Sequence, residues 1–201
     1  MGADLVWQPS LLEIAGVSGV RRTELGGGAW VDHGPAWCPG ADDLFAELLD
    51  HTPWAGREVR MYDRVLPEPR LTHRWTLADA PARLAAMAAT LGDRYGVAFT
   101  QVGANLYRDG ADGVAWHGDR VARELPEAVV ALVSLGAARP FRLRPTPGGP
   151  AGGGGSVGFL PGPGDLLVMG GSCQRTWQHS VPKCARAGAR ISVQFRHAYQ
   201  R

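Results

Sequence analysis

The chain has 201 residues, of which 45% are hydrophobic and 20% charged, as expected for one globular domain with a substantial core. Its 21 Lys and Arg balance 19 Asp and Glu, and the net charge of +2 excludes a broad basic field, so any nucleic-acid site must be a local patch. The three cysteines have no CxxC spacing, which argues against a disulfide framework and a structural zinc site. No apolar run reaches ~18 residues, which argues against a membrane span, and the N-terminus does not have the pattern of an export signal. We therefore expect a cytoplasmic protein.

The N-terminal half is expected to contain turns and two helices. Glycines and prolines mark turns throughout residues 1–40, which are therefore expected to be irregular. In Ala41–His51 the apolar residues recur at i, i+1, i+4 and i+5, and two aspartates stand where a helix N-terminus favours negative charge. A second helix is predicted over about 80–94, with Asp79 as N-cap and Gly96 as its stop.

From Phe99 onward the sequence indicates short strands, because β-branched and apolar runs are separated by Gly and Pro. These runs are Ala128–Leu135, Ser156–Leu160, Leu166–Met169 and Arg190–Tyr199. No helices alternate with them, which favours a sandwich or barrel of jelly-roll type over a parallel α/β sheet. The Gly-rich segment Pro145–Ser156 is expected to be a flexible hairpin loop, and we assign it no chemistry.

Two separated motifs could supply three metal ligands. His117 and Asp119 are two residues apart, so in an extended strand both side chains point to the same face, and His179 follows much later in the chain. Two imidazoles and one carboxylate on one face of a metal leave other positions open for a cosubstrate and dioxygen, as in non-haem Fe(II) oxygenases. An isolated HxD is common by chance, and the same ligands could bind zinc and hydrolyse a substrate with a zinc-bound water.

The last strand favours iron with an anionic cosubstrate. Arg190, Ser192, Gln194 and Arg196 alternate along it and therefore share one face. A buried arginine is costly unless an anion pairs with it, and its planar fork suits a carboxylate, so a 2-oxo dicarboxylic acid fits between the metal and Arg190. An outward orientation on a solvated face is the alternative, and it is easier to accept for Arg196 than for both arginines.

One strand earlier, Asn105 and Tyr107 also share a face, and their amide and hydroxyl could complete the hydrogen bonding of a bound carboxylate. Alone, this NxY pattern would carry no meaning. Its place in the chain, shortly before the HxD motif, gives it a possible role at the same site.

Taken in order, these motifs resemble the AlkB family of Fe(II)/2-oxoglutarate dioxygenases over about Phe99–Tyr199. The matching segments are Asn105–Gly110, His117–Asp119, Val133–Gly136 with Phe141–Arg144, Gly164–Gly170, Gln174 with Trp177–Lys183, and Arg190–Arg196. Each match is weak, but their common order is specific. Two departures concern the details: Ser192 stands where many members have Asn, and Arg120 follows the HxD where many nucleic-acid demethylases have an acidic residue.

The resemblance implies a mainly β protein with N-terminal helices (α+β), built on a double-stranded β-helix (jelly roll). It implies a core over residues 99–201 and an N-terminal extension over residues 1–98, with two helices and a substrate-recognition lid at about 57–76, packed together as one structural domain. The implied site residues are His117, Asp119 and His179 as catalytic iron ligands, Arg190 as the catalytic partner of the distal 2-oxoglutarate carboxylate, and Asn105, Tyr107, Ser192 and Arg196 as further cosubstrate-binding residues. The implied cofactors are Fe(II), 2-oxoglutarate and O2.

The predicted lid, Arg57–Thr76, interleaves basic and aromatic residues, as contacts to phosphates and stacking on bases require. From it we take Tyr62, Arg70 and Trp75 as candidate substrate-binding residues. A solvated, salt-bridged loop with Trp75 anchored in the core is the plainer alternative.

The expected reaction is oxidative demethylation of N-alkylated bases in DNA, ahead of RNA, by a monomer. Hydroxylation of an N-methyl group gives a product that collapses to formaldehyde and the free base, while 2-oxoglutarate becomes succinate and CO2. The same oxygenase chemistry on a protein or small-molecule substrate is the first alternative. A catalytically silent binding protein and a zinc hydrolase are less well supported, because neither explains the ligand set together with Arg190.

Overall fold

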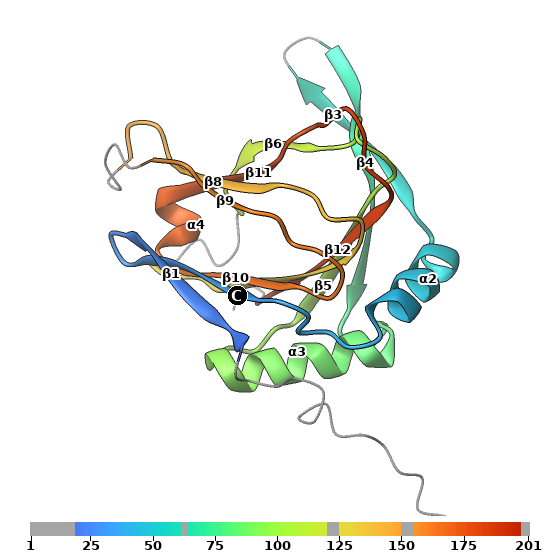
Figure 1. Ribbon diagram of the computed structural model, residues 1–201, viewed down its shortest axis with the longest axis horizontal. Helices are drawn as coiled ribbons and strands as arrows, with labels where there is room; N and C mark the ends of the chain where they lie inside the picture. Colours follow the sequence, from blue (N-terminus) through green and yellow to red (C-terminus); the bar gives the residue numbers. More distant parts are fainter. Residues whose placement is uncertain (1–18, 62–63, 120–124, 150–154, 198–201) are drawn as a thin grey trace, which may run out of the picture.

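Two antiparallel sheets face each other in the structure, a computed structural model that describes residues 19–61, 64–119, 125–149 and 155–197 (Figure 1). The strands are β1 (Arg21–Gly26), β2 (Ala29–Gly34), β3 (Ala55–Met61), β4 (Arg64–Thr76), β5 (Gln101–Tyr107), β6 (Val114–His117), β7 (Val130–Gly136), β8 (Phe141–Pro145), β9 (Val157–Phe159), β10 (Leu166–Gly171), β11 (Trp177–Val181) and β12 (Arg190–Arg196). The helices are α2 (Ala41–His51), α3 (Ala82–Tyr95) and the short α4 (Cys173–Thr176).

The large sheet has the strand order β1-β2-β10-β7-β12-β5-β4-β3, and the small sheet has the order β6-β11-β8-β9. In the large sheet β12 pairs along its whole length with β5 on one side and β7 on the other. The small sheet places β6 at its edge, next to β11. This mainly β architecture with few helices confirms the predicted double-stranded β-helix.

Strand alternation divides the interior into two cores. One face of the large sheet, with Ile191, Val193 and Phe195 of β12, packs against α2 and α3, which lie outside the sandwich (Figure 1). The other face, with Val130 and Leu132 of β7, packs against the small sheet. The even-numbered residues of β12 therefore point between the two sheets, as their alternation predicts.

The two predicted helices are present. Helix α2 begins and ends at the predicted residues and has Asp42 and Asp43 in its first turn. Helix α3 ends at Gly96, which adopts the left-handed conformation. The expected N-cap is wrong, because Pro81 occupies that position without a side-chain cap, and Asp79 instead hydrogen-bonds with Thr76 in the preceding turn.

The expectation of an irregular N-terminal segment is wrong for residues 21–34, which form the β1–β2 hairpin at the edge of the large sheet. The glycines between the strands have positive φ angles, which a tight turn requires, so they connect strands rather than interrupt structure. Asp32 accepts hydrogen bonds from Arg22 and from the hydroxyl of Tyr95, and thus joins the hairpin to α3. Residues 1–18 lie outside the described residues.

The strands predicted for the C-terminal half are present. Strands β8 and β9 pair with each other, so the Gly-rich segment connects the two arms of a hairpin as predicted, although residues 150–154 lie outside the described residues. Strands β3, β4 and β5 belong to one sheet, so the large sheet contains strands from both sides of the proposed boundary at residue 98. The division into an extension and a core stays a prediction.

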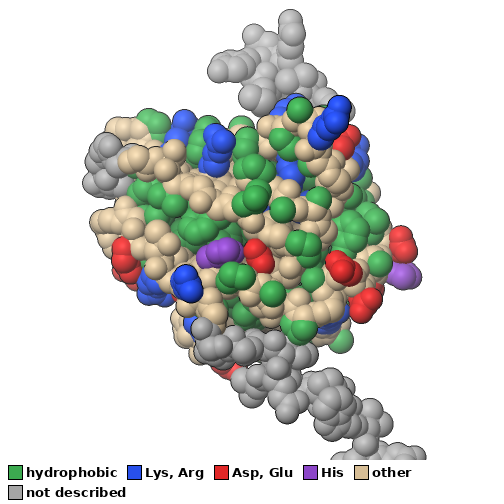
Figure 2. Space-filling model, viewed as in Figure 1, with side chains coloured by type: hydrophobic (Ala, Val, Ile, Leu, Met, Phe, Trp, Pro, Cys, Tyr) green, Lys and Arg blue, Asp and Glu red, His purple; other side chains and the backbone are tan. Residues whose placement is uncertain are grey.

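The surface carries charges of both signs. On the face shown in Figure 2, basic and acidic side chains are interspersed among hydrophobic ones. This distribution agrees with the small net charge of +2. Within the described part of the chain, no helix has the length and apolarity needed to cross a membrane.

Candidate metal and cosubstrate site

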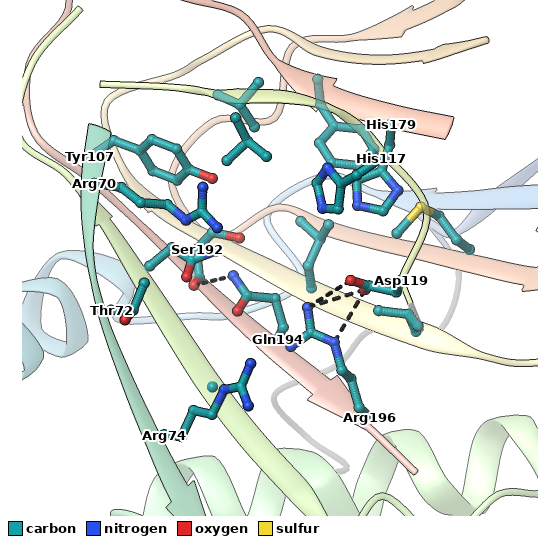
Figure 3. A pocket seen from close by; sticks show the side chains of 18 of the residues that line it. Arg70, Thr72, Arg74, Tyr107, His117, Asp119, His179, Ser192, Gln194 and Arg196 are labelled. Carbon is teal, nitrogen blue, oxygen red and sulfur yellow. Dashed lines mark hydrogen bonds and ion pairs between the residues drawn. The ribbon is translucent and has the colours of Figure 1, made fainter. Parts of the chain in front are cut away.

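The small sheet brings the three predicted metal ligands together. His179 of β11 stands opposite His117 of β6, and Asp119 follows just beyond the end of β6. The ligand atoms of the three side chains all lie within 4.8 Å of one another. The sequence suggested that Asp119 lies within the same strand as His117, but β6 ends at His117 and Asp119 lies two residues beyond it, with its carboxylate still close to the imidazoles (Figure 3).

Both imidazoles are prepared to bind a metal. The Nδ1 of His117 lies 2.9 Å from the carbonyl oxygen of Ala115, which can only accept a hydrogen bond, so Nδ1 carries the proton and Nε2 keeps its lone pair. His179 is buried and stacks on Phe141, with ring centres 5.4 Å apart. Burial lowers the pKa of His179 to about 3, despite the opposing effect of Asp119, so the ring is neutral at physiological pH.

Asp119 is held by two residues that lie far away in sequence, one at its carboxylate and one at its backbone amide. Arg196 of β12 donates to it from Nε at 3.1 Å and from a terminal nitrogen at 3.3 Å, and the backbone amide of Asp119 donates to Gln174 at 3.0 Å. Burial acts to raise the pKa of Asp119, but Arg196 and the two histidines lower it below its usual range. The carboxylate is therefore ionised and oriented before any metal binds.

The opposite end of β12 presents a buried arginine without an anionic partner among the described residues. Arg190 is 1% exposed, and its Nε donates to the hydroxyl of Ser134 at 2.9 Å. Within the described chain, neither terminal nitrogen has a hydrogen-bond partner. Burial is the main reason why the pKa of Arg190 is lowered. Two parallel donors in a buried site fit the distal carboxylate of a dicarboxylic acid.

A cavity of about 190 Å³ is lined by the metal triad and by Asn105, Tyr107 and Ser192, whereas Arg190 is not among its lining residues. In the sheet register Tyr107 is opposite Arg190, and Asn105 is opposite Ser192. The guanidinium carbon of Arg190 lies 5.3 Å from the ring centre of Tyr107. Asn105, Tyr107 and Ser192 thus line the same cavity as the metal triad, and Tyr107 is next to Arg190 in the sheet. Arg196 also lines the cavity, where its guanidinium is paired with Asp119, and its contact with the cosubstrate stays a prediction.

Strand β4 forms the wall of the cavity that faces the metal triad. Arg70, Thr72 and Arg74 extend from it into the cavity (Figure 3). The structure does not place the predicted stacking residue Trp75 there, because alternation turns its indole to the other face of β4, where it packs against the helix-side core. The third predicted substrate residue, Tyr62, lies outside the described residues.

Several residues at the site were not found from the sequence. Thr72 and Arg74 line the cavity, and their alternation with the predicted Arg70 is a usable signal, while Gln194 was placed on the cavity face without a role. Ser134 and Gln174 act through contacts with Arg190 and Asp119 that span 56 and 55 residues, and no local pattern marks such contacts.

Comparison with known proteins identifies the family. The sequence pattern described as "2OG-Fe(II) oxygenase superfamily" matches residues 51–196. The chain belongs to this superfamily. Its metal triad and buried Arg190 fit the metal and the 2-oxo acid in the superfamily's name, which confirms Fe(II) and 2-oxoglutarate, with O2, as the family's cofactors.

Curated relatives confirm the resemblance to the AlkB family. The chain is 30% identical to alpha-ketoglutarate-dependent dioxygenase alkB homolog 3 of Bos taurus over 188 residues, covering 81% of this chain and 65% of the relative. It is 29% identical to the DNA oxidative demethylase ALKBH2 of Arabidopsis thaliana over 192 residues, covering 76% and 60%. The chain therefore spans a little under two thirds of the length of these relatives.

Solved structures agree on the fold. A 2OG-Fe(II) oxygenase family oxidoreductase from Burkholderia pseudomallei aligns with a TM-score of 0.59 and 16% identity, over 85% of this chain and 88% of that one. A prolyl-4-hydroxylase from Pseudomonas putida aligns with a TM-score of 0.56 and 17% identity, over 83% and 92%. At these identities the likeness concerns the fold alone.

Proposed function

We propose that this protein is an Fe(II)- and 2-oxoglutarate-dependent dioxygenase that demethylates N-alkylated bases in nucleic acid. The observation that carries the proposal is the pairing of a three-ligand metal site with a buried Arg190, whose terminal nitrogens have no partner among the described residues. A zinc hydrolase would need the three ligands but not the arginine. A dioxygenase that uses a dicarboxylic 2-oxo acid needs both.

Each part of the cavity has a task in this reaction. His117, Asp119 and His179 would hold Fe(II), and Arg190 would hold the distal carboxylate of 2-oxoglutarate beside Tyr107. When bound, the iron with 2-oxoglutarate and O2 supplies the oxidising equivalents that hydroxylate an N-methyl group. The protein would fix the distance between the cosubstrate and the metal, and it keeps the buried imidazole of His179 neutral.

The wall formed by β4 supports a nucleobase as substrate. Arg70 and Arg74 extend from this wall into the cavity (Figure 3). Arg70 pairs with Glu68 at 3.2 Å, and the Nε of Arg70 has no partner among the described residues. Hydrogen-bond donors on the cavity wall suit the polar edge of a base that has left its stack.

DNA is the polymer we propose ahead of RNA. The support comes from the relatives, since the Arabidopsis thaliana protein is named a DNA oxidative demethylase. We also propose that the chain acts as a monomer, because one chain supplies all three metal ligands and the cosubstrate residues.

The test is a coupled product assay. The protein is loaded with Fe(II) and 2-oxoglutarate under anaerobic conditions, mixed with an oligonucleotide containing 1-methyladenine, and exposed to oxygen. Formaldehyde, succinate and unmodified adenine in equal amounts are expected for DNA, with less product from the matched RNA. A His117→Ala variant serves as the control and should form none of them.

Two results would contradict the proposal. Succinate formed without repair of any methylated oligonucleotide would direct the chemistry to another substrate class. Full activity of the His117→Ala variant would remove the metal site from the account.

A further inference from the structure

A second arginine is buried close to Tyr107. Arg139, in the connection between β7 and β8, is 1% exposed. Its terminal nitrogens donate to the backbone carbonyls of Asp109 and Asp112, each at 2.8 Å, and of Pro182 at 2.9 Å. All three acceptors are neutral carbonyls, so these hydrogen bonds fix the guanidinium without neutralising its charge.

The nearby carboxylate does not cancel this charge either. Asp112 accepts hydrogen bonds from both Nε and a terminal nitrogen of Arg108, each at 2.9 Å, and a further bond from the backbone amide of Arg108. Counting Asp109 and Asp112 against Arg108, Arg139 and Arg190 leaves one positive charge in excess around Tyr107. Buried charges of one sign are unfavourable together, so this end of the sheet is suited to an additional anion.

Arg139 and Arg190 both lie near the ring of Tyr107. Their guanidinium carbons are 5.8 Å and 5.3 Å from the ring centre. Burial is the main cause of the lowered pKa of Arg190; the charge of Arg139 lowers it further, and Tyr107 opposes both effects. An anion bound at Arg190 would relieve this repulsion, and would therefore be attracted by both.

We propose that Arg139 is a positioning residue that makes the cosubstrate site select a dicarboxylic 2-oxo acid over a monocarboxylic one. This inference rests on the proposed function, since it concerns the cosubstrate of the same site. Arg139 acts through its charge and by holding Tyr107 and the β5–β6 connection in place, whereas Arg190 makes the direct contact. The plainer alternative is that Arg139 only ties three loops together.

Two ligands separate these roles. 2-Oxoglutarate and 2-oxopentanoate have the same chain length and the same metal-binding end, but the second has a methyl group in place of the distal carboxylate. A charge near the distal carboxylate changes the ratio of the two affinities. A purely structural role changes both affinities alike.

The experiment measures both dissociation constants by calorimetry on the full chain loaded with Mn(II), which does not support turnover. For Arg139→Met we expect the preference for 2-oxoglutarate to fall about tenfold, as is typical for the loss of one nearby buried charge, with the affinity for 2-oxopentanoate unchanged. Arg139→Lys keeps the charge but not the fork, so its preference should stay within about twofold of the wild type while its melting temperature falls.

Arg83→Met is the matched control. Arg83 likewise donates to backbone carbonyls, those of Pro39 and Gly40, but it lies on α3 and away from Tyr107. Its loss should lower stability and leave the preference between the two ligands unchanged.

The results are decisive in either direction. An equal loss of affinity for both ligands in Arg139→Met, or no loss at all, would overturn the inference. If Arg139→Met does not fold, the charged variant Arg139→Lys provides the test. A lost preference for 2-oxoglutarate in Arg139→Lys would also overturn the inference. A wild-type protein that binds neither 2-oxo acid would instead contradict the proposed function. No nucleic acid enters the experiment, so failure of the nucleobase assignment leaves its outcome untouched.

Discussion

The two ends of β12 each carry an arginine on the same face, but only one of the two charges is paired with a carboxylate among the described residues. At one end Arg196 is paired with Asp119, a metal-ligand candidate, at 3.1 Å. At the other end Arg190 is fully buried, and its terminal nitrogens have no partner in the described chain. One cation is balanced by the protein, and the other is left for a ligand.

This difference explains how one strand can contribute to both the metal end and the cosubstrate end of the site. A buried pair is tolerated when geometry and hydrogen bonds are satisfied, whereas a buried lone charge lowers stability until something binds it. The metal end is therefore built in advance, and the cosubstrate end is completed only on binding. Substitutions at the two ends should have opposite effects on the stability of the ligand-free protein.

The largest effect is expected for Arg190→Met. Removing one partner of a buried, bidentate charge contact should weaken 2-oxoglutarate binding by at least about 100-fold. The free energy of unfolding of the ligand-free protein should stay the same or rise, because an unpaired buried charge is removed. Calorimetry and urea unfolding measure the two quantities. A large loss of stability with intact binding would reverse the roles that we assign to the two ends.

The matching change Arg196→Met should lower the stability of the metal-free protein by about 2 kcal/mol at pH 7, because it leaves Asp119 as an uncompensated buried charge. Since Arg196 depresses the pKa of Asp119, the stabilisation is present above the unfolded carboxyl pKa and is lost as pH falls through the lower folded value. The difference between variant and wild type should therefore shrink in acid.

Urea unfolding in the presence of a chelator, at pH 7 and in acid, tests this prediction. Addition of Mn(II) should restore much of the lost stability, since the metal replaces the missing cation. The double variant Arg196→Met/Asp119→Asn is the control, and it should be more stable than the single variant. A single variant as stable as the wild type would mean that the ion pair contributes nothing to the metal end.

A smaller effect is expected at the wall of the cavity formed by β4, where alternation again separates two roles. Arg70→Met should raise the KM for a methylated oligonucleotide about tenfold through a lost polar contact, and it should also lower stability because Glu68 loses its ion-pair partner. Trp75→Leu should lower stability by about 2 kcal/mol and leave the KM unchanged, because its indole packs against the core. An increased KM in the Trp75 variant alone would restore the stacking role that the sequence suggested.

The smallest effect belongs to Ser134→Ala. Its hydroxyl accepts the hydrogen bond from the Nε of Arg190, so its loss should turn the guanidinium and weaken 2-oxoglutarate binding about fivefold, in line with one hydrogen bond of about 1 kcal/mol. Isothermal titration of the ligand decides the matter. An unchanged affinity would mean that the sheet alone orients Arg190.

Strand alternation explains why much of the site could be predicted from sequence. It correctly placed Asn105, Tyr107 and Ser192 on the cavity side. In β4 the basic and aromatic residues belong to two different faces, so the composition of the segment alone does not show which of them reach the cavity. Trp75 was therefore assigned to the cavity, although it is one residue out of phase with Arg74.

Contacts between segments that lie far apart in the chain could not be predicted from the sequence. Nothing local to Arg196 indicates that it pairs with Asp119, 77 residues earlier, and nothing local to Arg139 indicates burial beside Tyr107. The hairpin β1–β2 was missed for a different reason. Three consecutive glycines look like a break in structure unless the flanking residues are recognised as strands, and only pairing with β10 makes β2 a buried strand.

The most direct test of the account is a crystal structure of the protein with Mn(II) and 2-oxoglutarate. We predict that His117 Nε2, the Asp119 carboxylate and His179 coordinate the metal, and that the distal carboxylate of 2-oxoglutarate meets the two terminal nitrogens of Arg190 while Arg196 remains on Asp119. A carboxylate bound instead to Arg196 or Arg70, with Arg190 still unpaired, would contradict the central claim.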